Sequence, residues 1–163
     1  IAGILEKFDE IAVAEKGIYK EKSNIILTRG TMLGTGDECA LKLTECCYMF
    51  NRAFSTANFM HGPFSLIDET ANVILLAPSG VFEEEYKNLA KRIKSLGGKL
   101  TVFSDIPEVL EVADNKVVMP AASDVTAPVT YGVAVSLLAL NVGLAKGLKV
   151  DTPRNLNKVT VTL

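Results

Sequence analysis

The sequence predicts an α/β fold in which a parallel β-sheet is covered by helices on both faces. Runs such as "NIILT" (24–28) and "ANVILLAPSG" (71–80) are apolar almost throughout, as in strands that are buried on both faces. Segments with helical periodicity alternate with these runs, which is the pattern of a parallel sheet. The 163 residues, 48% hydrophobic and 22% charged, suffice for one globular domain spanning 1–163 with a full core.

The individual elements follow from local patterns along the chain. The clearest helix, at 82–98, has apolar residues every three or four positions, acidic residues in its first turn, basic residues in its last and Gly97 after them. Pro153 excludes a helix from the tail at 150–163, which ends in a β-like alternation. The other predicted helices cover 1–18 and Asp37 to Phe50, and the predicted strands cover 24–28, 71–80, 99–105 and 115–120.

One uncharged segment, from Val125 to Ala145, is 21 residues long and could by length span a bilayer. It contains Pro128, Asn141 and Gly143, and it follows a soluble α/β pattern. A helix buried against the sheet or against a dimer partner is therefore favoured over a membrane span.

Charge and cysteine content narrow the possible partners and compartment. The net charge of −2, without a basic cluster, argues against a nucleic-acid or anionic-membrane surface. Cys39, Cys46 and Cys47 do not have the spacing of a zinc site, and on a helix Cys39 and Cys46 lie too far apart for a disulfide. We expect free thiols in a reducing cytoplasm, and neither a metal nor a cofactor.

Two glycine-containing loops could be taken for phosphate-binding loops. "RGTMLGTGDECA" (29–40) lacks the Gly-Lys-Ser/Thr ending of a P-loop, and Asp37 and Glu38 lie where its helix is predicted to begin. "PSGVFEEE" (78–85) likewise leads into three glutamates. The sequence therefore predicts that neither loop binds phosphate.

The predicted helix at 37–50 carries a charged stripe on an otherwise mostly apolar surface. Glu38, Lys42 and Glu45 fall within a sector of about 60°. Spacing alone favours a solvated ion pair, and the alternative is a cleft in which Glu45 acts as a base. A single histidine is more often structural than catalytic, and His61 is the only histidine in the sequence. A lysine near the C-terminus, such as Lys158, is by default solvated.

Three motifs taken together carry a resemblance to a known family. "ECALKLTE" (38–45), "MHGPFSLID" (60–68) and "DTPRNLNKVTVT" (151–162), in this order and spacing, resemble the sugar isomerase (SIS) domain. The similarity is to the second of the two such domains in phosphosugar isomerases and deaminases of the glucosamine-6-phosphate synthase type. It implies a flavodoxin-like, three-layer αβα sandwich around a five-stranded parallel sheet, with 150–163 as a catalytic tail.

The resemblance also implies roles for individual residues. Glu45 matches the base that moves a proton between C1 and C2 of the open-chain sugar, and His61 matches a ring-opening residue that comes from the neighbouring subunit. Lys158 matches a tail lysine at the sugar carbonyl, and Lys42 matches a lysine of the same site. These residue types suit the reaction, because ketose–aldose interconversion needs ring opening, proton transfer and charge stabilisation.

The implied ligand is a hexose 6-phosphate, and Arg29, Glu38 and Asn155 are expected to contact it. The serine- and threonine-rich phosphate loop of the family is absent from this sequence, and in two-domain relatives it belongs to the first domain. We therefore expect a homodimer or pairing with a second SIS domain. A hydrolytic aminosugar-6-phosphate deaminase, a fructosamine deglycase and a non-catalytic phosphosugar sensor remain open alternatives.

Overall fold

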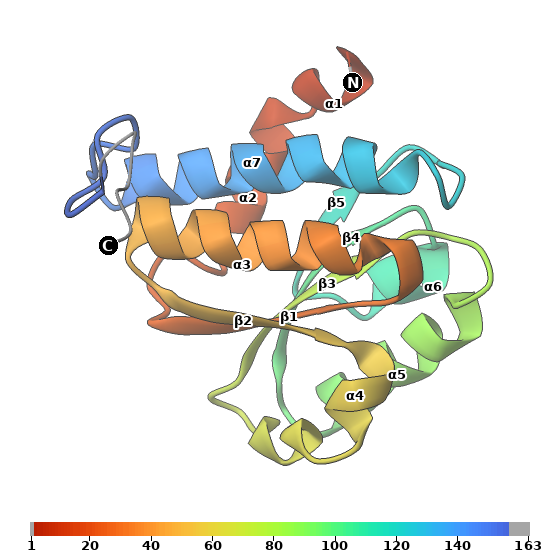
Figure 1. The fold of residues 1–163 in the computed structure, drawn as a ribbon. Helices are drawn as coiled ribbons and strands as arrows, with labels where there is room; N and C mark the ends of the chain where they lie inside the picture. The colour runs from red at the N-terminus through yellow and green to blue at the C-terminus, as the bar shows by residue number, and fades with distance from the viewer. Residues whose placement is uncertain (1, 157–163) are drawn as a thin grey trace, which may run out of the picture.

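A five-stranded, wholly parallel sheet forms the centre of the protein, with strand order β2-β1-β3-β4-β5. The computed structural model describes residues 2–156 (Figure 1). The predicted five-stranded αβα sandwich is confirmed. The strands are β1 (Ser23–Thr28), β2 (Phe50–Ser55), β3 (Asn72–Ala77), β4 (Lys99–Ser104) and β5 (Asn115–Val118).

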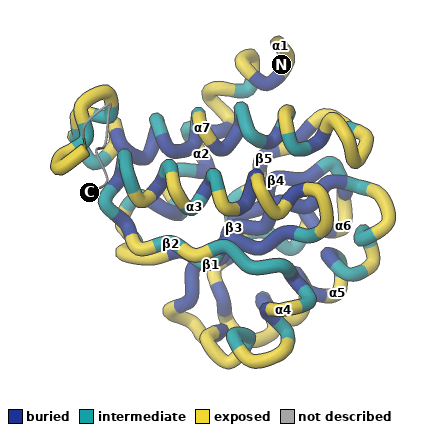
Figure 2. The backbone as a smooth tube through the Cα atoms, viewed as in Figure 1, coloured by how far each residue is buried: buried dark blue, intermediate teal, exposed yellow. Residues whose placement is uncertain are grey.

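Helices cover both faces of the sheet, and each face has its own apolar core. One face, through alternate strand residues such as Ile26 and Ile74, packs against the first layer of helices. The opposite face, through Leu27 and Leu75, packs against the second layer (Figures 1 and 2). The first layer contains α1 (Ala2–Leu5), α2 (Phe8–Glu15), α3 (Leu33–Cys47) and α7 (Ala127–Ala145), and the second contains α4 (Thr56–Met60), α5 (Glu83–Ser95) and α6 (Pro107–Glu111).

The helix predicted from Asp37 to Phe50 is wrong at both ends, and α3 runs instead from Leu33 to Cys47. It begins earlier because a 3₁₀ turn at Gly30–Met32 leads directly into it. It ends at Tyr48, which adopts a left-handed conformation (φ 56°) and donates its N–H to the Thr44 carbonyl. Asp37 therefore lies inside the helix, and no acidic residue occupies its first turn.

Sequence periodicity also missed short elements and merged others. β2, α4 and α6 were not predicted, since segments of five or six residues carry little periodicity. The helix predicted at 1–18 is divided into α1 and α2 by a turn at Lys7, whose ψ of 13° is not helical. Ile4 and Ile11 nevertheless both face the core, whereas Leu5 and Phe8 are exposed.

The uncharged segment forms the helix α7, which packs against α3 and α2. By length and apolar composition α7 could cross a membrane, but half of its most apolar stretch is buried inside the protein. Tyr131, Val135 and Leu138 have no exposed surface. The prediction of a helix buried within the fold is confirmed.

Candidate functional site

A pocket lies at the amino end of the sheet, where the end of α3 meets the chain tail. Its volume is about 430 Å³, and Glu45 and Asn155 both line it. These two predicted site residues are separated by more than a hundred positions in the sequence, so the fold brings them together. The other residues that line the pocket are Thr44, Tyr48, Met49, Phe50, Arg154 and Leu156.

Glu45, which lines this pocket, is the last residue of the charged stripe on α3. Lys42 Nζ donates a hydrogen bond to Glu45 Oε2 at 3.3 Å and lies 3.5 Å from Glu38 Oε1. Burial lowers the pKa of Lys42, but the hydrogen bond to Glu45 and the two carboxylate charges outweigh it, so the net shift is upward. Lys42 is therefore a cation at neutral pH, held between the two glutamates.

Tyr48, which the sequence analysis did not single out, attaches the tail to the pocket. Its hydroxyl oxygen accepts the Arg154 N–H at 2.8 Å, and the Arg154 guanidinium lies 4.1 Å from the centre of its ring. The left-handed backbone of Tyr48 directs the side chain toward the tail, and Asn155 is also left-handed (φ 61°). No local sequence pattern indicates a left-handed tyrosine, which explains why it was missed.

A chain of asparagine side chains supports the floor of the pocket. Asn72 of β3 donates to Asn24 of β1, which donates to Asn51 of β2 at 2.7 Å. Asn51 then donates to Thr44 Oγ1 at 3.2 Å and to the Met49 carbonyl at 3.0 Å. Amide hydrogen bonds therefore connect three strands to the residues around Glu45.

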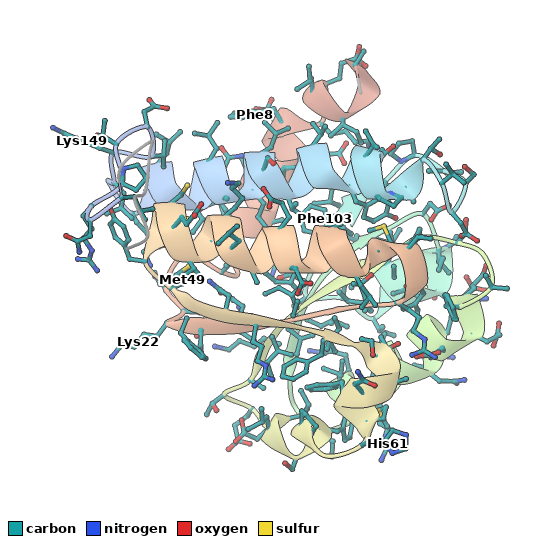
Figure 3. The ribbon with its side chains drawn as sticks, in the orientation of Figure 1. Phe8, Lys22, Met49, His61, Phe103 and Lys149 are labelled. Atoms are coloured by element: carbon teal, nitrogen blue, oxygen red, sulfur yellow. The ribbon has the colours of Figure 1, made fainter. Side chains whose placement is uncertain are left out.

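His61 lies at the other end of the molecule. It follows α4 and precedes Gly62, whose φ of 145° allows the turn into Pro63. The side chain is exposed and points outward, whereas Met49, beside the pocket, lies at the opposite end of β2 (Figure 3). β2 alone has six residues, which corresponds to roughly 20 Å. One chain therefore does not bring His61 and Glu45 together.

The remaining predicted site residues divide between the two ends. Arg29 follows β1 at the carboxyl end, where its Nε lies 3.7 Å from Glu85 Oε2. Glu38 does not line the pocket, and its Oε1 lies 3.5 Å from Lys42 Nζ. Lys158 falls outside the described residues, so its predicted role stays a prediction.

Comparison with known proteins identifies the family. The sequence profile of the SIS domain matches residues 17–145. The chain belongs to the SIS domain family. The glutamine–fructose-6-phosphate aminotransferase (isomerizing) of Aliivibrio fischeri is 37% identical over 155 residues, which is 93% of this chain and 25% of that protein. The corresponding protein of Salmonella typhi is 40% identical over 140 residues, or 84% of this chain and 23% of the relative. The chain thus spans about a quarter of the length of these relatives.

Solved structures agree with this assignment. The C-terminal domain of glucosamine-fructose-6-phosphate aminotransferase from Francisella tularensis superposes with a TM-score of 0.82 at 29% identity, covering 93% of this chain and 44% of that chain. Tagatose-6-phosphate ketose/aldose isomerase from Escherichia coli shares the fold, with a TM-score of 0.77 at 21% identity over 94% of this chain and 44% of its own.

Proposed function

We propose that this SIS domain is the C-terminal isomerase unit of a phosphosugar-converting enzyme of aminosugar metabolism. The reaction is ketose–aldose interconversion of a hexose 6-phosphate by proton transfer between C1 and C2. The observation that carries the proposal is the pocket that Glu45 and the tail residue Asn155 both line. The similarity of the chain to aminotransferases that are described as isomerizing also supports an isomerisation reaction.

Glu45 is the proposed base. Its side chain is 32% exposed, lines the pocket and accepts a hydrogen bond from Lys42, which positions the carboxylate. A base must reach a carbon-bound proton from a defined position, and a positioned carboxylate meets this requirement. The Lys42 cation lies beside it and can stabilise the negative charge that develops on the enediol oxygens.

His61 and Lys158 complete the proposed site from elsewhere. The location of His61 at the far end of β2 supports ring opening by the histidine of a neighbouring subunit. The tail at Arg154 is attached beside the pocket, which supports a role there for Lys158, four residues further on. The phosphate group of the sugar is bound by a second SIS domain or subunit.

Replacing Glu45 with Gln in the complete enzyme tests this proposal. Loss of the base should reduce hydrogen exchange between solvent and the sugar C1/C2 positions about 10²- to 10⁴-fold, which NMR in deuterated water measures. Glu84→Gln, an exposed glutamate on α5, is the matched control and should keep full exchange. Normal exchange in Glu45→Gln would refute the base assignment.

Two further measurements on the complete enzyme distinguish the alternative functions. Tight binding of fructose 6-phosphate in calorimetry, without any exchange, would identify a sensor instead of an enzyme. Product analysis with glutamine, ammonia or water as co-substrate distinguishes an aminotransferase from a deaminase or deglycase.

A further inference from the structure

The helix α7 is apolar on its outer side as well as on the side that packs into the fold. No side chain between Val125 and Ala145 carries a charge. One side of α7 is buried in the first helical layer, and the other is exposed or half-buried (Figure 2). At 100° per residue, the outward residues fall within a sector of about 100°. We call them the α7 face, which consists of Val129, Val133, Ser136, Leu137, Leu140 and Leu144.

The helix α5, in the opposite layer, shows the arrangement that is usual for a helix covering a sheet. All of its exposed residues are polar, namely Glu84, Asn88, Lys91, Arg92 and Ser95. The α7 face instead includes Val129, which is 59% exposed, and Leu144, which is 54% exposed. A helix that is apolar on all sides is normally buried on all sides. The fold of this domain therefore leaves one side of α7 without the contact that its composition indicates.

The hydroxyl groups on the outer side of α7 are already satisfied within the helix. Ser136 Oγ donates to the Gly132 carbonyl at 2.9 Å, and Thr130 Oγ1 donates to the Thr126 carbonyl at 3.1 Å. Covering the α7 face would therefore leave neither hydroxyl without a partner and would bury no charge on the helix. The face is about 23 Å long from Val129 to Leu144, which suits packing against another helix.

A protein partner fits the α7 face better than a membrane surface does. Helices that lie in a membrane interface carry Lys and Arg along their polar side. α7 has no charged residue, and its other side is buried against the rest of the domain. The partner must instead present an uncharged apolar surface of its own.

Two observations indicate that this partner is another domain of the same polypeptide. α1 lies against α7, so the amino terminus is on the same side of the sheet as α7 (Figure 1). In the matched Francisella tularensis structure, more than half of the chain lies outside the part that this protein covers. The proposed contact between subunits joins Glu45 to His61 and involves no residue of the α7 face.

We infer that the α7 face is the surface against which a second SIS domain of the same polypeptide packs. The inference rests on the proposed function in one respect, because it takes a two-domain enzyme as the complete protein. The contact buries the uncharged face of α7 against an apolar helical surface of the other domain. It thereby holds the domain that binds the sugar phosphate in a fixed position relative to the domain that carries Glu45.

Photo-crosslinking in the complete enzyme tests the inference. The photoreactive residue p-benzoylphenylalanine replaces Leu137, at the centre of the α7 face, and irradiation links it to the group that lies against it. The product should keep the mobility of one chain on a denaturing gel. Mass spectrometry should place the linkage in a SIS domain outside residues 1–163. Val129 is a second probe position, with the same expected product, if the larger side chain at the centre prevents the domains from assembling.

Lys91 is the matched control position, because it lies on the exposed side of a helix in the opposite layer. The same probe at Lys91 should give no linkage to the other SIS domain. A product with the mass of two chains from the α7 probes would mean that a second copy covers the face. That result, a linkage outside a SIS domain, a linkage only within residues 1–163, or the absence of any product from both α7 probes would overturn the inference.

This readout does not depend on catalytic activity, so the inference and the proposed function can fail separately. The expected linkage together with normal hydrogen exchange in Glu45→Gln would remove the base assignment and leave the contact standing. Loss of exchange in Glu45→Gln without a linkage from the α7 face would remove the contact alone.

Discussion

The two ends of the parallel sheet are built by different interactions. At the amino end, amide hydrogen bonds cross three strands and reach the residues around Glu45, and Tyr48 attaches the tail there. At the carboxyl end, loops from three parts of the chain line a crevice of about 260 Å³, and the Thr28 hydroxyl beside it donates to the Leu76 carbonyl. The amino end is thus held by side-chain hydrogen bonds that cross three strands, although the buried Asn72 Oδ1 has no partner among the described residues, whereas the carboxyl end is formed by loops around a crevice.

Removing the centre of the asparagine chain should show the largest effect on stability. Asn24 is 3% exposed, and Asn24→Ala leaves a donor of Asn72 and an acceptor of Asn51 without partners. We expect the free energy of unfolding to fall by about 3 kcal/mol, measured by urea denaturation. Thr28→Val at the carboxyl end removes a single hydrogen bond to the Leu76 carbonyl and should cost about 1 kcal/mol. Equal losses in the two variants would contradict the difference between the ends.

Two glycines of α3 allow a matched test of packing at the carboxyl end. A Cβ at Gly36 would lie 3.0 Å from Thr28 Cγ2 of β1, whereas a Cβ at Gly34 would have no neighbour within 4 Å. Gly36→Val should therefore destabilise the protein by about 2 kcal/mol through overpacking. Gly34→Ala should stabilise it by about 0.5–1 kcal/mol, because alanine favours a helix. Calorimetric unfolding measures both, and a stable Gly36→Val variant would show that α3 can move away from the sheet.

The thiols of α3 predict a dependence of stability on alkaline pH. Burial is the main cause that raises the pKa of both Cys39 and Cys47 to about 12. Each thiol therefore stays protonated in the folded state while it ionises near pH 8.5 in the unfolded state. Its contribution is complete below pH 8.5 and is lost as pH rises toward 12.

Cys39→Ala isolates this contribution. Between pH 8.5 and 10 the wild type should lose roughly 2 kcal/mol more than the variant in the free energy of unfolding, measured by denaturant titration. Parallel curves for the two proteins would mean that the Cys39 thiol is accessible to solvent base.

The sequence predicted those parts of the fold that carry strong periodicity or apolar runs. The buried strands around Ile26 and Leu75 and the helix α5 lie close to their predicted positions. The short strand β2 and the left-handed Tyr48 escaped prediction, because long-range pairing with β1 and a single backbone dihedral define them. These features form the floor and wall of the pocket.

The candidate site was only partly accessible from the sequence. The stripe from Glu38 to Glu45 was predicted by helical spacing, and its ion pairs are present. The separation of His61 from Glu45 was implied only by the family resemblance, because no local sequence pattern shows the direction in which β2 carries the chain. The asparagine chain joins positions on three strands and has no local signature.

Complementation between subunits tests the central claim most directly. In the proposed enzyme, Glu45 and His61 of one site come from different subunits, so Glu45→Gln and His61→Ala homo-oligomers should each be inactive. Mixing the two variants under conditions of subunit exchange should restore activity, to about a quarter of the wild-type value for randomly paired dimers, because half of the pairs carry one intact site. If the mixture stays as inactive as the separate variants although the subunits have exchanged, the shared site does not exist.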